Sequence, residues 1–507
     1  MKKILVSFVV MTMTSVSAWA GGILTNTNQS IDFLRNPARD AAIGLDGVYS
    51  NPAGVVFLPE GFHLGINWQY AHQTRTITST NPVFQLGRKN NAGSPTKIFE
   101  GVADAPIIPS VQVAYNMENW SLQANLSVPG GGGSCEFSDG LGSFESVVGS
   151  IASMLAPLGA TGYDMDGYMK GRQYYYGIQI GAACKVTPEL SLYGGLRMIY
   201  GDATYKAKIS NIQVNTANGY IDFGSYLQAA SSTVNNGLDQ VNAGLAQVNA
   251  GIAQYQAAGA EVPAQLVATQ TQLTAQQAQL EGTKESLGQL QKYSQGVNLL
   301  CNQDGVGFAP IIGVDYKTGK FNFAAKYEFR TQIRMKNEST VNEASEIPAV
   351  NKFRDGESVN EDMPALLTLG VQYSPVDIVR INAGWHHFFD KDASWYNNSQ
   401  DLLSHNTNEF LLGAEWDTTE NLTFSAGGQL TRYGMSDEYI SDMSFVVNSY
   451  SIGFGFSYKL SQKVSVKAAY FQTYYGDYDR TDATNPQIKD SFTRTNRVFG
   501  VGCQLDL

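Results

Sequence analysis

Few residues of this 507-residue chain have the type and spacing that catalysis or metal binding requires. The adjacent histidines His386 and His387 are the most suggestive pair, because imidazole nitrogens bind metal ions and haem iron. They lie in an alternating segment that predicts a β-strand, and neighbouring side chains of a strand point to opposite faces. The two rings cannot converge on one ion, so we expect no metal site and no cofactor.

A hydrolase site is also absent from the sequence pattern. It would need a nucleophilic serine beside a histidine, with a polar residue that orients the ring. The candidate histidines on the outer face of predicted strands, His72 and His387, have no evident serine partner. We therefore expect no catalytic residue and no enzyme activity.

Charged side chains fall on the polar face of several predicted strands, and they allow two hypotheses. The first is that a basic residue binds a substrate carboxylate, for which the candidates are Arg197, Lys326, Arg330 and Arg380. The second is a network of mutually compensating charges that fills an interior, and it also draws on the residues Glu328, Glu415 and Lys467.

The four cysteines match no metal-binding spacing. Export from the cytoplasm, argued below, favours disulfides. Cys135 and Cys301 fall in loops predicted at the same end of the molecule, so we expect a disulfide between them. Cys184 and Cys503 fall on outer positions of non-neighbouring strands, and we expect both to be free.

Strict alternation of apolar and polar residues predicts the elements that carry these side chains. In the first such segment the apolar set is Phe62, Leu64, Ile66, Trp68 and Tyr70, and the polar or small set is His63, Gly65, Asn67, Gln69 and Ala71. The same pattern recurs at 422–427 and 450–459. Polar faces rich in Gly and Ser are typical of the lumen of a membrane barrel.

About fourteen such segments occur, and the connections between them alternate between short and long, as in outer-membrane barrels. The segments are 60–76, 107–116, 119–129, 171–186, 189–209, 307–317, 320–335, 364–374, 377–389, 409–417, 421–433, 448–460, 462–475 and 494–507. We therefore predict an all-β fold, a transmembrane β-barrel of about 14 antiparallel strands over residues 60–507, in the outer membrane of a Gram-negative cell.

Composition and the N-terminus agree with export to a membrane. Charged residues make up 16% of the chain, below the roughly 25% of soluble domains. Residues 1–20 have the pattern of a signal peptide, with Lys2 and Lys3 before an apolar run and Ala18-Trp19-Ala20 at the cleavage site. The formal net charge of −11 argues against nucleic-acid binding.

One segment, residues 224–296, breaks the strand pattern. Its apolar residues recur at heptad spacing, first at Val234, Leu238, Val241, Leu245, Val248, Ile252 and Tyr255, then at Leu266, Leu273, Leu280 and Leu287. We predict an antiparallel helical hairpin, a coiled-coil insertion in an extracellular loop. It could be a lid, a partner-binding stalk or a solvated spacer.

Residues 21–59 precede the first strand and are not strand-like. They are rich in small residues and contain two triplets, Asn36-Pro37-Ala38 and Asn51-Pro52-Ala53. With a barrel behind it, this segment has a lumen to fill, and we interpret it as a plug.

A signal peptide, a plug with Asn51-Pro52-Ala53-Gly54 and about fourteen strands together resemble the FadL-type family, outer-membrane transporters of long-chain fatty acids and other hydrophobic compounds. A second similarity is Ser127-Val128-Pro129-Gly130 at the end of the third strand. The last strand, 497–507, alternates to the chain end and resembles the signal that the barrel-assembly machinery reads.

The resemblance implies passive, plug-gated uptake with lateral exit through the barrel wall. It places gating at Asn51, Pro52 and Ala53. It places the mature N-terminus near the ligand, at Gly21, Gly22, Ile23 and Leu24, and the lateral exit at Pro129 and Gly130. The partners would be a fatty acid-like hydrophobic molecule, outer-membrane lipid and the assembly machinery, and we expect a monomer. The alternatives are a surface adhesin or structural barrel whose hairpin binds a partner, and a haem-related receptor.

Overall fold

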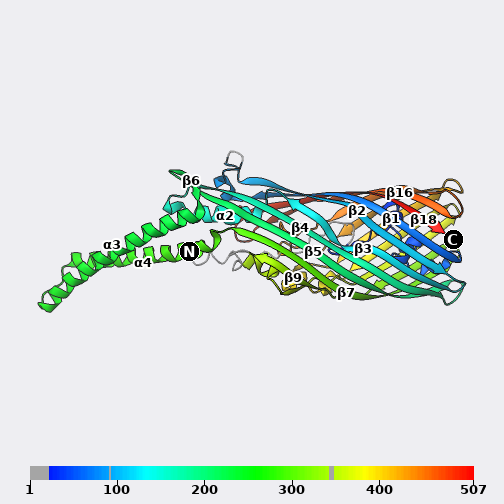
Figure 1. Ribbon diagram of the computed structural model, residues 1–507, viewed down its shortest axis with the longest axis horizontal. Helices are drawn as coiled ribbons and strands as arrows, with labels where there is room; N and C mark the ends of the chain where they lie inside the picture. The colour runs from blue at the N-terminus through cyan, green and yellow to red at the C-terminus, as the bar shows by residue number, and fades with distance from the viewer. Residues whose placement is uncertain (1–21, 91–92, 342–347) are drawn as a thin grey trace.

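The computed structural model describes residues 22–90, 93–341 and 348–507, so the predicted signal peptide and Gly21 lie outside the described residues. Fourteen antiparallel strands close into the predicted barrel around an interior plug (Figure 1). The first strand, β1 (Gly61–Thr80), pairs with the last, β18 (Lys489–Asp506), from His63 opposite Asp506 to Thr80 opposite Lys489. This pairing joins the first and last strands and closes the sheet.

The strands differ in length around the barrel. The taller side consists of β1, β2 (Thr96–Asn116), β3 (Trp120–Phe137), β4 (Gly162–Lys185), β5 (Leu190–Thr216), β7 (Val297–Thr318) and β18. The shorter side consists of β8 (Phe321–Glu328), β11 (Leu366–Val376), β12 (Val379–Phe388), β13 (Thr407–Asp417), β14 (Leu422–Arg432), β15 (Ser449–Lys459) and β16 (Val464–Tyr475). Four short strands extend the wall at its long-loop end: β6 (Gly219–Asp222), β9 (Arg334–Val341), β10 (Ser358–Asn360) and β17 (Tyr478–Thr481).

The alternation in the sequence corresponds to two faces of the wall. On β1, Ile66 and Trp68 are 52% and 38% exposed on the outside, whereas Asn67 and Gln69 are buried in the lumen. The same holds around the barrel, where the outer positions are aliphatic or aromatic. Among the described residues, none of the helices combines the length and the apolar composition needed to span a membrane.

The taller strands begin or end well beyond the predicted segments. For example, β4 starts at Gly162, and the segment predicted from the sequence starts at residue 171. The additional outward positions of β4 include Asp164, Asp166 and Lys170, which are polar. The apolar–polar alternation stops at the end of the apolar band, although the hydrogen-bonded ladder continues beyond it.

The plug contains a short helix, α1 (Ile31–Arg35), and two 3-10 helices, η2 (Leu45–Val48) and η3 (Gly54–Phe57). Wall glycines give it room. A Cβ atom on Gly453 would lie 2.1 Å from the backbone oxygen of Leu34, and one on Gly413 would lie 1.9 Å from the Asn36 side chain. The glycines of the wall therefore let the plug lie directly against the strands.

The predicted hairpin is present as α3 (Phe223–Ala257) and α4 (Ala264–Leu290), which project from the end of the barrel opposite the C-terminus (Figure 1). Glycines seven residues apart on α3 face leucines seven residues apart on α4; the pairs are Gly237 with Leu280, Gly244 with Leu273, and Gly251 with Leu266. The leucine seam was predicted. The glycines opposite the leucines were not predicted, and they let the two helices approach closely.

The base of the hairpin rests on a helix that the sequence analysis did not predict, α2 (Gly142–Met154), between β3 and β4. The Tyr226 hydroxyl donates a hydrogen bond to the Leu158 backbone oxygen just beyond α2 (2.9 Å). Leu227 and Leu238 of α3 and Val148 of α2 belong to one buried apolar cluster, so the hairpin is anchored in the core of the barrel end.

The predicted disulfide is wrong, because Cys135 and Cys301 are both free and lie in β3 and β7. Cys135 is opposite Gly171 of β4, which is opposite Tyr205 of β5, which is opposite Cys301. Three strand spacings of about 4.8 Å separate the two thiols. A disulfide needs Cα atoms within about 7 Å of each other. Cys184 and Cys503 are free, as predicted.

Candidate functional site

The plug is bound to the wall by a first charge network on the shorter side of the barrel. Arg39 of the plug binds Asp46 within the plug (2.8 Å) and Glu415 of β13 (2.9 Å). Glu415 also accepts from Arg35 of α1 (3.0 Å) and from Arg380 of β12 (3.0 Å). Buried charges of both signs are thus paired, which is the condition for placing them in a dry interior.

A second network surrounds Tyr49 of the plug. Arg197 of β5 and Lys326 of β8 both bind Glu328, at 2.5 and 2.6 Å. Lys326 also donates to the Tyr49 backbone oxygen (2.8 Å), and both cations lie over the Tyr49 ring, at 4.8 and 4.9 Å from its centroid. A third contact, from Lys467 to Asp32 of α1 (2.5 Å), ties the plug to β16.

The candidate carboxylate-binding residues therefore have carboxylate partners within the protein. Arg197 and Lys326 share Glu328, and Arg380 binds Glu415 and Asp417. Arg330 is more exposed, beyond the end of β8, where it lies 3.6 Å from Asp362 and donates to the Asp392 backbone oxygen. This arrangement agrees with the second hypothesis, a network of mutually compensating charges that fills the interior.

The two histidines point to opposite faces, as predicted for neighbours on a strand. His386 is buried between Asp40 of the plug and Glu409 of β13, at 2.9 Å from each. His387 lies on the outer face beside Asn408 (2.9 Å). Within the described part of the chain, no group of three or more possible metal-binding side chains is found.

The second triplet, Asn51-Pro52-Ala53, contacts the taller side of the wall. The Asn51 side chain donates to Asp315 of β7 (2.6 Å) and accepts from the Gly54 backbone N–H (3.3 Å). The backbone oxygens of Pro52 and Ala53 accept from Gln123 of β3 and Ser191 of β5, at 2.8 and 2.7 Å. The triplet therefore joins three wall strands to the plug.

The wall has an opening in its ladder between β2 and β3. These strands pair at Ala103 with Cys135 and again at Val111 with Leu126, and no pairs join residues 104–110 to residues 127–134 in the described chain. The register between β3 and β4 also shifts twice in this stretch, and Gly131 and Gly133 adopt positive φ values of 96° and 70°. Bulges at glycine bend a strand and interrupt its pairing. We name residues 104–110 and 127–134 the wall gap.

The N-terminal part of the plug fills the wall gap from inside. Asn26 donates through its backbone N–H to the Pro129 oxygen (2.8 Å), and the Leu24 oxygen accepts from Gly131 (3.2 Å). Thr25 forms an isolated antiparallel bridge with Gly130. These hydrogen bonds satisfy backbone groups of β3 that its neighbouring strand does not reach.

One residue, Gln29, joins the two edges of the gap, one through its side chain and the other through its backbone oxygen, and sequence reasoning missed it. Its amide donates to the Val128 oxygen and its carbonyl accepts from the Val128 N–H, both at 3.0 Å. On the other edge, Ser110 and Gln112 of β2 donate to the Gln29 backbone oxygen, at 2.6 and 3.0 Å. A single Gln in a polar leader gives no sequence signal, because its role depends on the gap.

The predicted ligand-proximal residues lie in an apolar part of the lumen above the plug. Ile23 and Leu24 are buried in a cluster that includes Met335, Met363 and Trp395. A Cβ atom on Gly22 would lie 2.6 Å from the Phe388 ring. Ion pairs thus surround the body of the plug, whereas its N-terminus packs against apolar side chains.

Solved structures share this architecture. A Pseudomonas aeruginosa FadL homologue aligns over 96% of this chain and 100% of its own, with a TM-score of 0.62 and 12% identity. The Pseudomonas putida toluene transporter TodX aligns over 97% of this chain and 100% of its own, with a TM-score of 0.55 and 12% identity. No family model and no curated protein sequence matches the chain. The predicted resemblance to the FadL-type family is therefore confirmed at the level of the fold, a plugged fourteen-stranded barrel.

Proposed function

We propose that this protein is an outer-membrane passive transporter for hydrophobic small molecules such as fatty acids. The observation that carries the proposal is the wall gap with the plug's N-terminal segment bound in it. A cargo molecule that displaces residues 24–29 would find an opening in the wall beside the apolar upper lumen. The protein would be monomeric and inserted by the barrel-assembly machinery.

Physical chemistry favours a sideways exit for such cargo. An alkyl chain released into an aqueous periplasm would expose its methylenes to water, at about 0.8 kcal/mol each. Passage through the wall gap into outer-membrane lipid avoids that exposure. TodX, which shares the fold, is a toluene transporter, and this supports hydrophobic cargo.

A covalent closure of the wall gap tests this route. Ser110→Cys and Ser127→Cys would place thiols on the two edges just above the last β2–β3 pair, Val111 with Leu126. A background without the native cysteines avoids mispairing. With the bond verified by mass spectrometry, we expect uptake of a labelled hydrocarbon to stop and to return on reduction.

The matched control places the cross-link where the ladder already exists, at Val113→Cys and Ala124→Cys, which are direct partners. That bond should leave uptake unchanged. Uptake that continues at the wild-type rate with the gap bridged would contradict an exit that needs the two edges of the gap to separate, because the bond holds them together.

An adhesin is the second candidate, because α3 and α4 project beyond the barrel (Figure 1). With 35 residues, α3 is about 50 Å long at 1.5 Å per residue. Replacing residues 226–295 by a short glycine linker separates the two functions. A transporter should keep uptake, whereas an adhesin should lose cell-surface binding and show no uptake in either form.

A further inference from the structure

The outer face of the taller side carries basic side chains just beyond the apolar band. They belong to the two strands that run side by side toward the hairpin end of the barrel, β4 and β5 (Figure 1). We name them the outer basic patch: Lys170 and Arg172 of β4, and Lys206 and Lys208 of β5. The chain as a whole has a formal net charge of −11, so its composition does not account for this cluster of cations.

Strand pairing places the four cations beside one another. Lys170 is directly opposite Lys206. Arg172 follows two residues after Lys170 on β4, and Lys208 follows two residues after Lys206 on β5. Directly opposed side chains have Cβ atoms about 5 Å apart, and successive side chains on one face of a strand are about 7 Å apart. A single anionic group can therefore contact more than one member of the patch.

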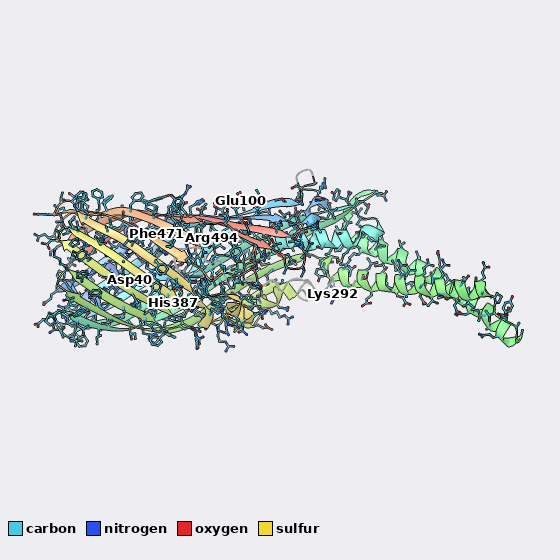
Figure 2. All side chains as sticks on the ribbon, turned by 180° about the vertical axis from the view of Figure 1, so that it is seen from behind. Asp40, Glu100, Lys292, His387, Phe471 and Arg494 are labelled. Atoms are coloured by element: carbon cyan, nitrogen blue, oxygen red, sulfur yellow. The ribbon has the colours of Figure 1, made fainter. Side chains whose placement is uncertain are left out.

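Neutral or acidic side chains border the patch on both sides. In the row of directly paired positions that contains Lys170 and Lys206, the residues of the other strands are Leu300 of β7, Glu136 of β3, Val102 of β2 and Thr74 of β1. Glu100, two residues from Val102 on β2, is exposed and acidic. Figure 2 shows it nearer the hairpin end of the barrel than Asp40 of the plug. The positive charge in this row is thus concentrated on β4 and β5.

The two cations of β4 have partners within the wall. Lys170 forms an ion pair with Glu136 of β3 (2.8 Å). Arg172 forms one with Asp202 of β5, also at 2.8 Å. These pairs are partly exposed, so they hold the side chains in place without burying them.

The two cations of β5 differ from those of β4. Both Lys206 and Lys208 are exposed, and among the described residues no carboxylate forms an ion pair with either. The acids whose charge reaches them are Glu136 and Asp166. Glu136 is paired with Lys170, and Asp166 is paired with Lys89. The patch therefore presents two ammonium groups that the protein does not neutralise.

Tyrosines mark the level of the patch relative to the membrane. Tyr174 and Tyr176 occupy the next outward positions of β4 toward the apolar band, with their rings stacked at 5.9 Å between centroids. Tyr200 of β5 is directly opposite Tyr176. Tyrosine is enriched where the hydrocarbon of a membrane meets its head groups. Cations that lie one or two positions farther out are thus at the level of the head groups, on the hairpin side.

This setting favours a phosphorylated lipid. In an outer membrane the leaflet on this side contains lipopolysaccharide, whose lipid A portion carries phosphate groups and acyl chains. Lysine binds phosphate as a point charge, and arginine binds it through paired hydrogen bonds. Like charges opposite each other on neighbouring strands are destabilising, and a phosphate between them would reverse the sign of that interaction. The tyrosines and the apolar band below them provide a surface for the acyl chains.

We propose that the outer basic patch binds the phosphate groups of outer-leaflet lipopolysaccharide, whose acyl chains then lie along the apolar band. The inference rests on the outer-membrane location of the proposed transporter and is independent of its cargo. Arg172 is directly opposite Ser134, a residue of the wall gap. The bound lipid would therefore lie beside the wall gap, along its β4 side.

Native mass spectrometry of the full-length protein in detergent tests the site. The protein is titrated with diphosphorylated lipid A and with the same lipid A after removal of both phosphates. EDTA is present so that no divalent cation bridges like charges. We expect the wild type to bind the diphosphorylated form more tightly. Lys206→Gln with Lys208→Gln should raise the Kd of that form about tenfold or more, because each lysine near an anionic surface contributes to binding. The Kd of the dephosphorylated form should not change.

Two further variants serve as controls. Lys459→Gln with Lys463→Gln removes the same charge from exposed positions at the short turn between β15 and β16, at the other end of the barrel, and should leave both Kd values unchanged. Lys206→Arg with Lys208→Arg keeps the charge of the patch and should bind the diphosphorylated lipid at least as tightly as the wild type. This variant distinguishes loss of charge from loss of structure.

Several outcomes would overturn the lipid site. They are equal affinity of the wild type for the two lipids, an unchanged Kd in the Lys206 and Lys208 glutamine variant, and an equal increase in the Lys459 and Lys463 variant. Inorganic pyrophosphate that displaces the lipid at an equal concentration would assign the patch to a soluble phosphate and would also overturn it.

Hydrocarbon uptake, measured on the same variants in cells, separates this inference from the transport proposal. Uptake by a wild-type protein that shows no preference for the phosphorylated lipid would overturn the lipid site and leave transport intact. A clear preference for the phosphorylated lipid in a protein that takes up no hydrocarbon would support the lipid site and overturn transport.

Discussion

At the scale of single residues, the chemistry of a side chain does not reveal its role in this barrel; its partners do. Arg197 and Arg380 were reasonable carboxylate-binding candidates in the sequence, yet both are ion-paired with carboxylates of other wall strands, Glu328 and Glu415. Gln29 gave no signal, yet it joins both edges of the wall gap. The difference arises because a lumen charge can be neutralised by a wall carboxylate, by the plug or by cargo, and the sequence does not show which group lies opposite it.

The two Asn-Pro-Ala triplets provide a prediction at this scale. Asn51 donates to Asp315 of the wall, whereas the side-chain oxygen of Asn36 accepts from Ala38 within its own triplet (3.2 Å). Asn51→Ala removes a donor from a buried carboxylate, which costs about 1–3 kcal/mol. We expect a lower unfolding midpoint in detergent and a higher rate of sugar entry in liposome swelling.

Asn36→Ala is the control for that experiment. It removes one local hydrogen bond of about 1 kcal/mol and no bond to the wall, so the sugar permeability should remain that of the wild type. If both variants leak equally, anchoring of the plug is not specific to the second triplet.

At the scale of elements, periodicity predicted the strands that lie within the apolar band and the leucine seam of the hairpin. It failed where pairing continues without apolar alternation. The first 11 residues of β2, from Thr96 to Pro106, were missed because Pro106 argues against a strand interior, as does Pro109 within the predicted segment. They are tolerated because β2 borders the wall gap, where no ladder with β3 is required. The disulfide failed for a similar reason: pairing moved both cysteines from loops into strands.

The hairpin supplies the prediction for this scale. Gly244 faces Leu273, whose side chain would be 3.3 Å from a new Cβ, whereas Gly282 has nothing within 4 Å of such an atom. Replacing glycine by leucine within a helix gains up to about 1 kcal/mol of propensity. At Gly244 overpacking costs about 1–3 kcal/mol and exceeds that gain.

Hydrogen exchange of the hairpin amides shows whether the cost of overpacking exceeds the gain in helix propensity. Protection should fall in Gly244→Leu and rise in Gly282→Leu relative to the wild type. Increased protection in both variants would show that the glycine–leucine seam does not set the distance between α3 and α4.

At the scale of the whole molecule, the lumen is divided along its axis. The lower part holds the body of the plug through buried ion pairs, which are costly to break one partner at a time. The upper part is apolar around Ile23 and Leu24, and it connects to the hairpin base through the same cluster. Among the described residues of the plug, by contrast, those that form hydrogen bonds with the wall gap are residues 24–29. On this ground we propose that the N-terminal segment moves while the plug body stays in place.

A reversible tether decides between movement of the segment and movement of the whole plug. A Cβ atom on Gly313 of β7 would lie 3.7 Å from the Cβ of Ala53. That separation suits a disulfide. In a background without the native cysteines, Ala53→Cys with Gly313→Cys should therefore form a bond without displacing either backbone. Uptake of a labelled hydrocarbon is then measured in oxidised and reduced cells, with Ala53→Cys alone as the control for the oxidant.

The ion pairs from Arg39 to Glu415 and from Lys467 to Asp32, and the hydrogen bond from Lys326 to the Tyr49 backbone oxygen, would all have to break if the plug body left the wall. The tether would add a covalent bond to that cost. Blocked uptake in the oxidised double variant, restored by reduction, would show that the Asn51-Pro52-Ala53 region must move. Undiminished uptake with the bond formed would rule out gating by the plug body. Release of residues 24–29 from the wall gap would then be the step that opens the barrel.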